Sequence, residues 1–398
     1  MATRWSAAKA SGSRGGGQSS QSAAPPDTRF GFKTKDHHHG QCQYSFHREA
    51  GRIERRERIF MRINRASGWL DALGFSWLVP ILKIAAGDSV KEQMTELKRV
   101  LLIPLIGIAA FLVLWGVLAP QIQTSLGAVP GPAQVWTQTV NLWKDHVRER
   151  EKAAAFYERQ DERNAKLEAA GKSDKIKWRS YTGKPTYIDQ IGTSLKTVGL
   201  GFLIATIIAV PLGIASGLSR SFNGAINPLI QIFKPVSPLA WLPIVTMIVS
   251  ALYVDPVDWL SKSLLISAVT VTLCSMWPTL INTALGVASV DKDLMNVGRV
   301  LQLPTMKTVT KLVLPSSLPL IFTGLRLSLG VGWMVLIAAE MLAQNPGLGK
   351  FVWDEFQNGS SQSLAKIMVA VFTIGIIGFA LDRLMYALQR AFTFSANR

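Results

Sequence analysis

The sequence predicts an all-α integral membrane protein with about six transmembrane helices. Hydrophobic residues make up 48% of its 398 residues and charged residues only 17%, whereas about a quarter of a soluble protein is charged. The apolar residues gather in runs of about 20, the length that a bilayer core requires. The net charge of +17 comes from Lys and Arg beside these runs. This pattern indicates cytoplasmic loops and anionic membrane lipid rather than nucleic-acid binding.

The region before the first span differs from it in composition. Residues 1–65 are rich in Ser, Gly, Ala and Gln and end in a strongly basic stretch, so we expect a disordered, basic tail. No apolar run in it is long enough for a signal peptide. Residues 66–99 are predicted to form interfacial or packed helices, because their apolar stretch, 69–87, contains Asp71, Pro80 and Lys83.

The two cysteines, Cys42 and Cys274, give no disulfide framework. Cys42 lies near several histidines, but its polar, low-complexity surroundings favour disorder over a metal site. Cys274 lies in an apolar run and is expected to pack there. We therefore expect no metal on this chain.

The first span, residues 100–120, follows Lys98 and Arg99, which suits a cytoplasmic start. Residues 121–190 then form a periplasmic loop. Its charged insert, residues 141–180, carries opposite charges at helical spacing and can be helical while solvated. The insert is either a surface for a binding protein or a passive insertion.

The other spans lie within residues 191–390. The third is interrupted by Lys234-Pro235 and Ser237-Pro238. Irregular backbone at membrane depth needs protein or a wet cavity to supply hydrogen bonds, so this break either lines a pathway or packs. Six spans place both termini, the tail 391–398 and the 288–316 loop in the cytoplasm. The predicted spans are 195–218, 226–252, 263–286, 318–342 and 366–388.

The 288–316 loop is the most informative stretch. It carries four basic residues and cannot lie in lipid, yet Leu294, Val297 and Val300 begin an apolar helical face that continues through Leu301 and Leu303. A proline interrupts the pattern, and a second basic turn then leads into the fifth span. The loop is therefore predicted to be an amphipathic elbow continuous with a transmembrane helix.

This loop resembles the cytoplasmic signature loop of the inner-membrane permeases of binding-protein-dependent ABC importers. The family pattern is Glu-Ala-Ala, three residues, Gly, nine residues, Ile, any residue and Leu-Pro. Anchored on Leu314-Pro315, the pattern puts Leu312 at the Ile position, Gln302 at the Gly position and Asn296-Val297-Gly298 at Glu-Ala-Ala. The Leu-Pro and the apolar residue match, whereas the acidic residue and the glycine do not.

Flanking segments narrow the resemblance to the branch that handles nitrate, sulfonate, taurine and bicarbonate. These segments are residues 233–244, 314–342 and 345–360. The sequence Asn-Val-Gly-Arg-Val-Leu of the loop, residues 296–301, most resembles the nitrate-type permeases. Roughly residues 100–390 are covered, apart from the charged insert. The resemblance implies a MetI-like permease core with an N-terminal extension.

It further implies that the 288–316 loop docks in a cleft of an ATPase subunit. The alternative for the same residues is an ordinary basic helix lying on anionic lipid. The coupling residues that the resemblance implies are Asn296, Val297, Gly298, Arg299, Gln302, Leu303, Leu312, Leu314 and Pro315.

Two ionisable residues lie inside the fifth span. Arg326, Trp333 and Glu340 are spaced by seven and face roughly one way on a helix. The two charges lie about 21 Å apart along the axis, too far to pair, so each needs its own partner or water. Because charges inside a span usually face a cavity or the bundle interior, this face is predicted to border an anion pathway. Alternatively, Arg326 snorkels to head groups and Glu340 to the outer interface.

No catalytic constellation is visible. Gly347-Leu348-Gly349-Lys350 imitates a P-loop but lacks its first glycine and the following Ser or Thr. We expect no enzyme activity and no cofactor on this chain, with ATP hydrolysis on a separate subunit.

The resemblance implies a permease subunit of an ATP-driven importer in the bacterial inner membrane, for a small anion and most simply nitrate or nitrite. Expected partners are ABC ATPase subunits, a second permease copy in a homodimer and a periplasmic or lipid-tethered solute-binding protein. A permease for taurine, alkanesulfonate or bicarbonate is an alternative. A membrane scaffold and a stand-alone channel or secondary carrier are further alternatives. Secondary carriers often show repeated halves, and we find no convincing repeat in this sequence.

Overall fold

The computed structural model describes residues 70, 78–85, 89–124, 127–254, 257, 259–360 and 362–396. All of them belong to one structural unit, Ile59–Arg398. The predictions for the tail 1–65, for Cys42 and for Asp71 lie outside the described residues. In the described part, secondary structure is helical except for a two-stranded antiparallel ribbon of β1 (Gln123–Thr124) and β2 (Gly127–Ala128).

The first transmembrane helix is longer than its apolar run. α3 (Val90–Leu97), a π-helical turn (Lys98–Leu102) and α4 (Ile103–Leu118) follow one another without a break. The short α2 (Leu78–Ala85) precedes them. No residue of α4 is buried, as expected for a helix whose apolar side chains face lipid on nearly all sides. Its one aromatic contact with the core joins Trp115 to Phe372, with ring centroids 5.3 Å apart.

Four further helices are long and apolar enough to cross a membrane: α6 (Tyr187–Leu218), α9 (Lys262–Ala288), α12 (Leu314–Ala343) and α14 (Ser363–Ala396). The predicted third span is a bent pair, α7 (Arg220–Phe233) and α8 (Pro238–Leu252), whose axes differ by 103°. Pro235 and Pro238 cause this break, because proline lacks an N–H and disfavours helix in the residue before it. The model thus confirms an all-α membrane fold with five spans, or six if the bent pair is one.

The core is built around α9, which packs between α6 and α12. Glycines of α6 let the backbones approach: a Cβ added at Gly201 would lie 2.7 Å from the carbonyl oxygen of Ala268, and one at Gly213 would lie 2.8 Å from that of Leu280. Small residues at helix interfaces are the usual means of close packing in membranes. Gly199, also on α6, has no atom of another helix within 4 Å of an added Cβ.

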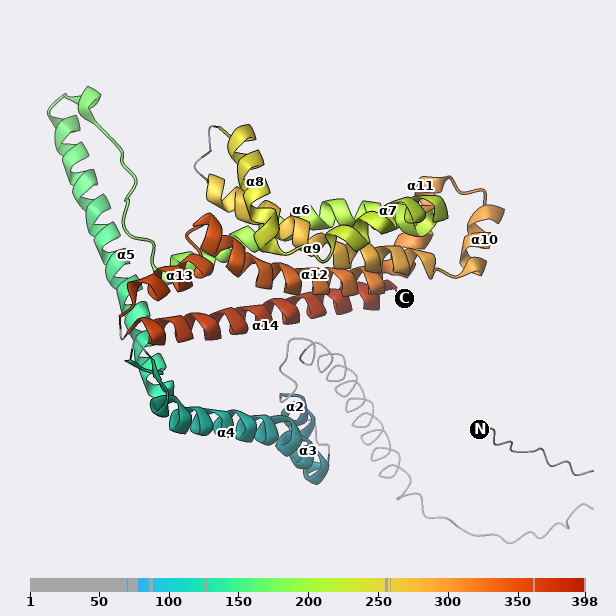
Figure 1. Cartoon of the computed structure of the whole chain (residues 1–398), viewed down its shortest axis with the longest axis horizontal. Helices are drawn as coiled ribbons and strands as arrows, with labels where there is room; N and C mark the ends of the chain where they lie inside the picture. Colours follow the sequence, from blue (N-terminus) through green and yellow to red (C-terminus); the bar gives the residue numbers. More distant parts are fainter. Residues whose placement is uncertain are drawn as a thin grey trace, which may run out of the picture. The chain divides into compact units, whose positions relative to one another are not determined.

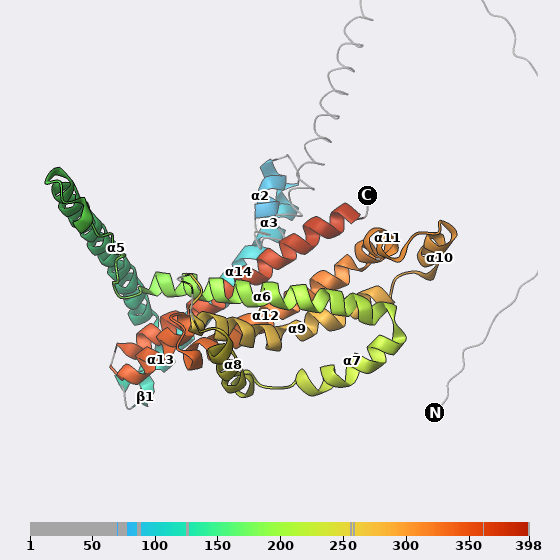
Figure 2. The ribbon, with the colours of Figure 1, turned by 90° about the horizontal axis from the view of Figure 1, so that it is seen from above.

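The two ends of the core carry different structures (Figures 1 and 2). α6, α9, α12 and α14 lie side by side. At one end are α10 (Lys292–Val300) and α11 (Thr305–Thr308), and at the other are α13 (Leu348–Asn358) and part of α5 (Pro132–Ala169). The 288–316 loop and the charged insert are therefore at opposite ends of the helix core.

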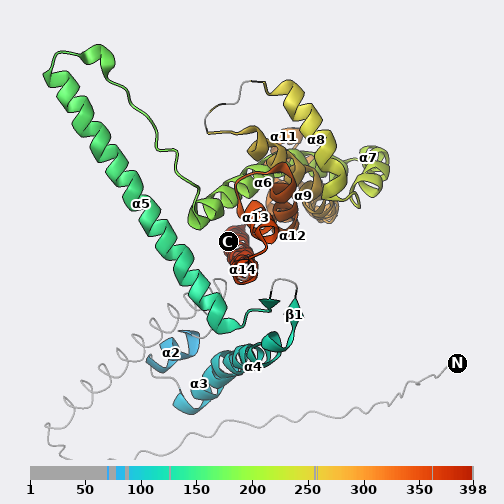
Figure 3. The same cartoon turned by 60° about the vertical axis from the view of Figure 1, so that its left-hand side comes forward.

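The charged insert is helical, as its charge spacing predicted, but α5 starts earlier and ends sooner than residues 141–180. It begins with Pro132 in its first turn, where the missing N–H costs nothing. It ends before Gly171, whose φ of +67° suits glycine at a helix C-terminus. The chain then returns along α5 (Figure 3). We call residues 149–186, the far half of α5 and this returning segment, the arm.

Candidate functional site

The 288–316 loop is a folded elbow. The Asp291 side chain caps α10 by accepting a hydrogen bond of 2.9 Å from the N–H of Asp293. After α11, a π-helical turn (Val309–Val313) runs directly into α12. Leu314 and Pro315 begin α12, and Pro315, which has no N–H to donate, lies directly after the π-helical turn. The loop is therefore continuous with a transmembrane helix.

Gln302 stands where the family pattern has glycine. Its backbone adopts the left-handed conformation that favours glycine. Its φ is +48°. The N–H of Leu303 donates to the carbonyl of Gly298 and the N–H of Gln302 to that of Arg299, both at 3.0 Å, which is the Schellman pattern of a helix C-terminus. The sequence departs from the motif here, but the backbone of Gln302 has the left-handed conformation that glycine adopts at the least cost.

This geometry makes a prediction for Gln302→Gly. Removing the Cβ from a left-handed position should raise the free energy of unfolding by about 1 kcal/mol, or the unfolding midpoint by about 2 °C, as measured by thermal unfolding of the purified chain in detergent. Gln231→Gly is the matched control: Gln231 lies inside α7, so this variant should lose about 1 kcal/mol. Equal loss in both variants would contradict the prediction.

Because Gly298 has no side chain, α10 can pack closely against the π-helical turn that precedes α12. Gly298 is buried, and a Cβ there would lie 2.9 Å from Cδ1 of Leu312. Val313, next to Leu312, is fully buried. Two residues of the motif, Gly298 at the second Ala position and Leu312 at the Ile position, thus hold the elbow together internally.

The apolar face predicted for the loop divides into two parts. Leu294 and Leu303 are half-buried. The tip of the elbow instead presents apolar side chains that no described residue covers: Val297 (50% exposed), Val300 (82%), Leu301 (63%) and Met306 (73%). Asn296 and Arg299 lie beside them and are exposed. Contiguous exposed apolar side chains rimmed by polar ones mark an interaction surface.

Arg326 has its own partner, as the sequence required. Its guanidinium donates to Asp382 of α14, with Nη2 2.8 Å from Oδ2, and lies over the Tyr386 ring at 5.3 Å. The Arg326 side chain is 36% exposed. It borders a groove of about 600 Å³ between α12 and α14, lined also by Thr323, Leu327, Gly330, Val331, Met334 and Gln389.

Trp333 and Glu340 lie inside the packed core and border no groove that contains Arg326. Trp333 is 6% exposed and its Nε1 donates to the carbonyl of Ile374 at 3.0 Å. Glu340 is fully buried. The structure thus separates the three residues that shared a helix face: one borders a groove and two are surrounded by protein.

Glu340 joins three helices at the end of the core opposite the elbow. Its Oε2 accepts from Ser194 Oγ of α6 at 2.8 Å and from the N–H of Gly349 at 3.0 Å. Ser194 Oγ in turn accepts from the N–H of Leu348 at 2.9 Å. Because Gly347 at the N-cap of α13 has no side chain, the carboxylate and this hydroxyl satisfy the first N–H groups of α13.

Sequence reasoning missed the partners Asp382 and Ser194. Asp382 had a visible signal: it is an acidic residue within an apolar run, and such a residue usually pairs with a base in another span. Ser194 had no such signal, since serine is common in membrane helices. Nothing in the local sequence reports a contact across 146 residues.

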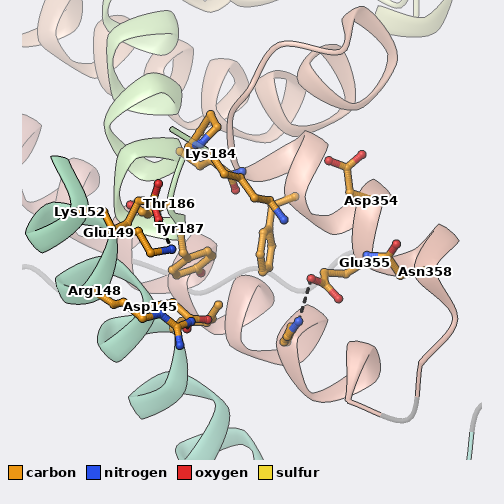
Figure 4. Close-up of a pocket in the computed structure, with 15 residues that line it drawn as sticks. Asp145, Arg148, Glu149, Lys152, Lys184, Thr186, Tyr187, Asp354, Glu355 and Asn358 are labelled. Carbon is orange, nitrogen blue, oxygen red and sulfur yellow. Dashed lines mark hydrogen bonds and ion pairs between the residues drawn. The ribbon is translucent and has the colours of Figure 1, made fainter. Parts of the chain in front are cut away.

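A second cavity, of about 390 Å³, lies between α5, the start of α6 and α13 (Figure 4). Its rim carries equal numbers of acidic and basic side chains, most of them paired. The pairs include Arg148 with Asp145, Lys152 with Glu149 and Lys366 with Glu355. Such a rim offers no net charge to attract a simple anion.

Comparisons with known proteins place these features in a family. The model of the binding-protein-dependent transport system inner membrane component matches residues 209–394, which include the 288–316 loop. The bicarbonate transport system permease protein CmpB of Synechococcus elongatus is 34% identical over 293 residues, 73% of this chain and 88% of that protein. The nitrate import permease protein NrtB of the same organism is 35% identical over 218 residues, 52% and 74% of the two chains. The taurine transport system permease protein TauC of Escherichia coli is 31% identical over 208 residues, 52% and 70% of the two chains.

Proposed function

We propose that this chain, which belongs to the family of inner-membrane components of binding-protein-dependent transport systems, is the permease through which an ATP-driven importer moves a small anion. The observation that carries the proposal is the elbow: a folded helical turn, continuous with α12, that presents uncovered apolar side chains such as Val300. Such a device can receive force from another subunit and pass it to a membrane helix. The relatives named for bicarbonate, nitrate and taurine all have substrates that carry an anionic group.

Nitrate or nitrite is the substrate that we propose first. Taurine or alkanesulfonate and bicarbonate are the alternatives. The test is uptake by proteoliposomes that contain the chain with its ATPase subunits and its solute-binding protein, offered labelled nitrate, bicarbonate and taurine in turn. ATP-dependent uptake of nitrate alone supports the first choice. Uptake of only one of the others replaces it, and absence of ATP-dependent uptake of all three contradicts the anion importer.

Coupling follows from the mechanical continuity of the elbow with α12. Closure of two ATPase subunits would draw two elbows together, one from each permease copy, and rotate the attached α12 helices about a midplane cavity. Asn296 to Leu303 would form the contact, while Leu312 and Gly298 keep the elbow rigid. A stand-alone channel or secondary carrier would instead transport without ATPase subunits, so omitting them from the proteoliposomes separates the two classes.

The pathway proposal rests on Arg326, which borders the groove between α12 and α14. Arg326→Gln is expected to reduce uptake at least tenfold, but it also leaves Asp382 with only the more distant Arg383, at 3.9 Å, which by itself costs stability. The double variant Arg326→Gln with Asp382→Asn removes both charges. If the double variant has normal expression and full uptake, Arg326 serves packing only. If its uptake stays low, Arg326 acts on the substrate.

A further inference from the structure

The arm extends beyond anything that the helix core requires. The first half of α5 packs on the core through Val135 and Leu142, which are 7% and 9% exposed. The far half of α5 contacts the returning segment instead, and both reach past the end of the core (Figure 3). A membrane protein gains no burial of apolar core from such an extension, so the arm needs another explanation.

Amide side chains of α5 hold the returning segment in one fixed geometry. Gln160, 6% exposed, accepts from the N–H of Arg179 at 2.8 Å and donates to the carbonyl of Arg179 at 3.3 Å. Asn164, 3% exposed, donates to the carbonyl of Lys177 at 3.3 Å. One side chain thus satisfies both backbone groups of a residue, as a neighbouring strand would. The arm is therefore a preorganised structure rather than a loose loop.

The root of the arm is tied to the start of α6. Arg150 forms an ion pair of 2.6 Å with Asp189, and His146 lies 2.7 Å from Thr186 Oγ1. Tyr181 donates to Glu149 at 2.7 Å. That bond, with Lys152 beside it, lowers the pKa of Glu149 below its ordinary value. The orientation of the arm is thereby linked to a transmembrane helix.

The outer surface of the returning segment is basic and has an aromatic centre. Trp178 is 71% exposed, and its neighbours Lys177 and Arg179 are exposed on either side. Within residues 172–184 the only acidic residue is Asp174. The basic residues of this stretch are Lys172, Lys175, Lys177, Arg179 and Lys184. Trp and Arg are the residues that most often dominate the energy of protein–protein contacts.

The arm suits a protein partner better than a lipid surface. A helix that lies on lipid separates a basic polar face from an apolar one. On the far half of α5, the face opposite Gln160 instead carries Glu151, Glu158 and Glu162 with alanines between them. These carboxylates would be repelled by anionic head groups, whereas the exposed basic residues of the returning segment fit an acidic protein surface.

We propose that the arm docks an acidic face of the solute-binding protein. The docking surface is formed by Lys175, Lys177, Trp178 and Arg179, which are all exposed and which we call the basic strip. The inference rests on the proposed function, because a solute-binding protein is a partner of this chain if the chain is the permease of such an importer. We expect that protein at the end of the core opposite the elbow. Trp178 inserts as the apolar anchor, and Lys175, Lys177 and Arg179 pair with carboxylates around it. The link from Arg150 to α6 then lets docking bias the helix core.

The test measures binding of the purified solute-binding protein to the complete transporter in nanodiscs. Trp178→Ala and the triple variant Lys175→Glu, Lys177→Glu, Arg179→Glu are each expected to weaken binding at least tenfold, while ATP hydrolysis without the binding protein stays unchanged. The triple change to Gln should give a smaller loss. Glu158→Lys with Glu162→Lys is the control, because it changes charge on the opposite face of the same arm and should leave binding intact.

The outcomes separate this inference from the proposed function. If the unaltered transporter binds the solute-binding protein and all arm variants bind it equally well, the docking surface lies elsewhere and the permease function stands. The triple variant that introduces Glu at positions 175, 177 and 179 could instead lose affinity for phosphatidylglycerol vesicles while it binds the solute-binding protein as before. In that case the arm is a lipid contact and the inference fails. If the unaltered transporter neither binds the protein nor imports an anion with ATP, both proposals fail.

Discussion

Replacing Glu340 with alanine should lower the free energy of unfolding by about 3 kcal/mol and abolish most transport. Two buried donors, the Ser194 hydroxyl and the Gly349 N–H, would lose their acceptor, and each such loss costs about 1 to 3 kcal/mol. The start of α13 would separate from α6 and α12. Thermal unfolding in detergent and uptake in proteoliposomes measure the two effects.

Glu340→Gln supplies the graded comparison. It keeps the side-chain volume and one oxygen for the Gly349 N–H, so a smaller loss of about 1 kcal/mol is expected. Glu151→Ala, on the exposed face of α5, is the neutral control. An alanine variant at position 340 that unfolds at the temperature of the unaltered protein would show that the carboxylate does not hold α13.

Introducing Asp at both Val300 and Leu301 should release the ATPase subunits. The two side chains are 82% and 63% exposed in the chain alone, and we expect a partner to bury them. Losing their apolar contact and placing two carboxylates in that interface should weaken subunit binding by about a hundredfold, or about 2.7 kcal/mol. The dissociation constant of the ATPase subunit for the permease in nanodiscs is the measurement.

The same variant separates docking from folding. Because both residues are exposed, the unfolding midpoint of the isolated chain should not change. Lys91→Asp with Thr95→Asp, two exposed positions of α3, adds the same carboxylates away from the elbow and should leave ATPase binding intact. Normal affinity in the Val300 and Leu301 variant would mean that the tip of the elbow lies outside the contact.

The elbow was the part of the candidate site that the sequence predicted best. Its basic residues, helical apolar spacing and Leu314-Pro315 are local features, so its amphipathic character and its fusion to α12 could be read directly. The mismatch at Gln302 could not be interpreted in the same way. Only the backbone, with φ of +48°, shows that Gln302 adopts the left-handed conformation that favours glycine.

The ionisable residues of α12 show the limit of helical spacing. Spacing by seven correctly predicted that Arg326 and Glu340 do not pair with each other. It could not show that Arg326 pairs with Asp382, 56 residues away, or that Glu340 binds Ser194, 146 residues away. The role of this face in transport stays a prediction, now concentrated on Arg326, which borders the groove.

The sequence by itself determined the class of protein and the presence of the elbow. It also determined the number of spans, apart from whether the bent pair α7 and α8 counts as one. These depend on the length of apolar runs and the placement of charge, and lipid imposes both on the chain segment by segment. The tertiary structure alone decided the 103° bend between α7 and α8, the capping of α13 by Glu340 and the extension of the arm past the core. Each of these depends on which distant segments meet, and a hydrogen bond between α6 and α12 leaves no trace in the spacing of either helix.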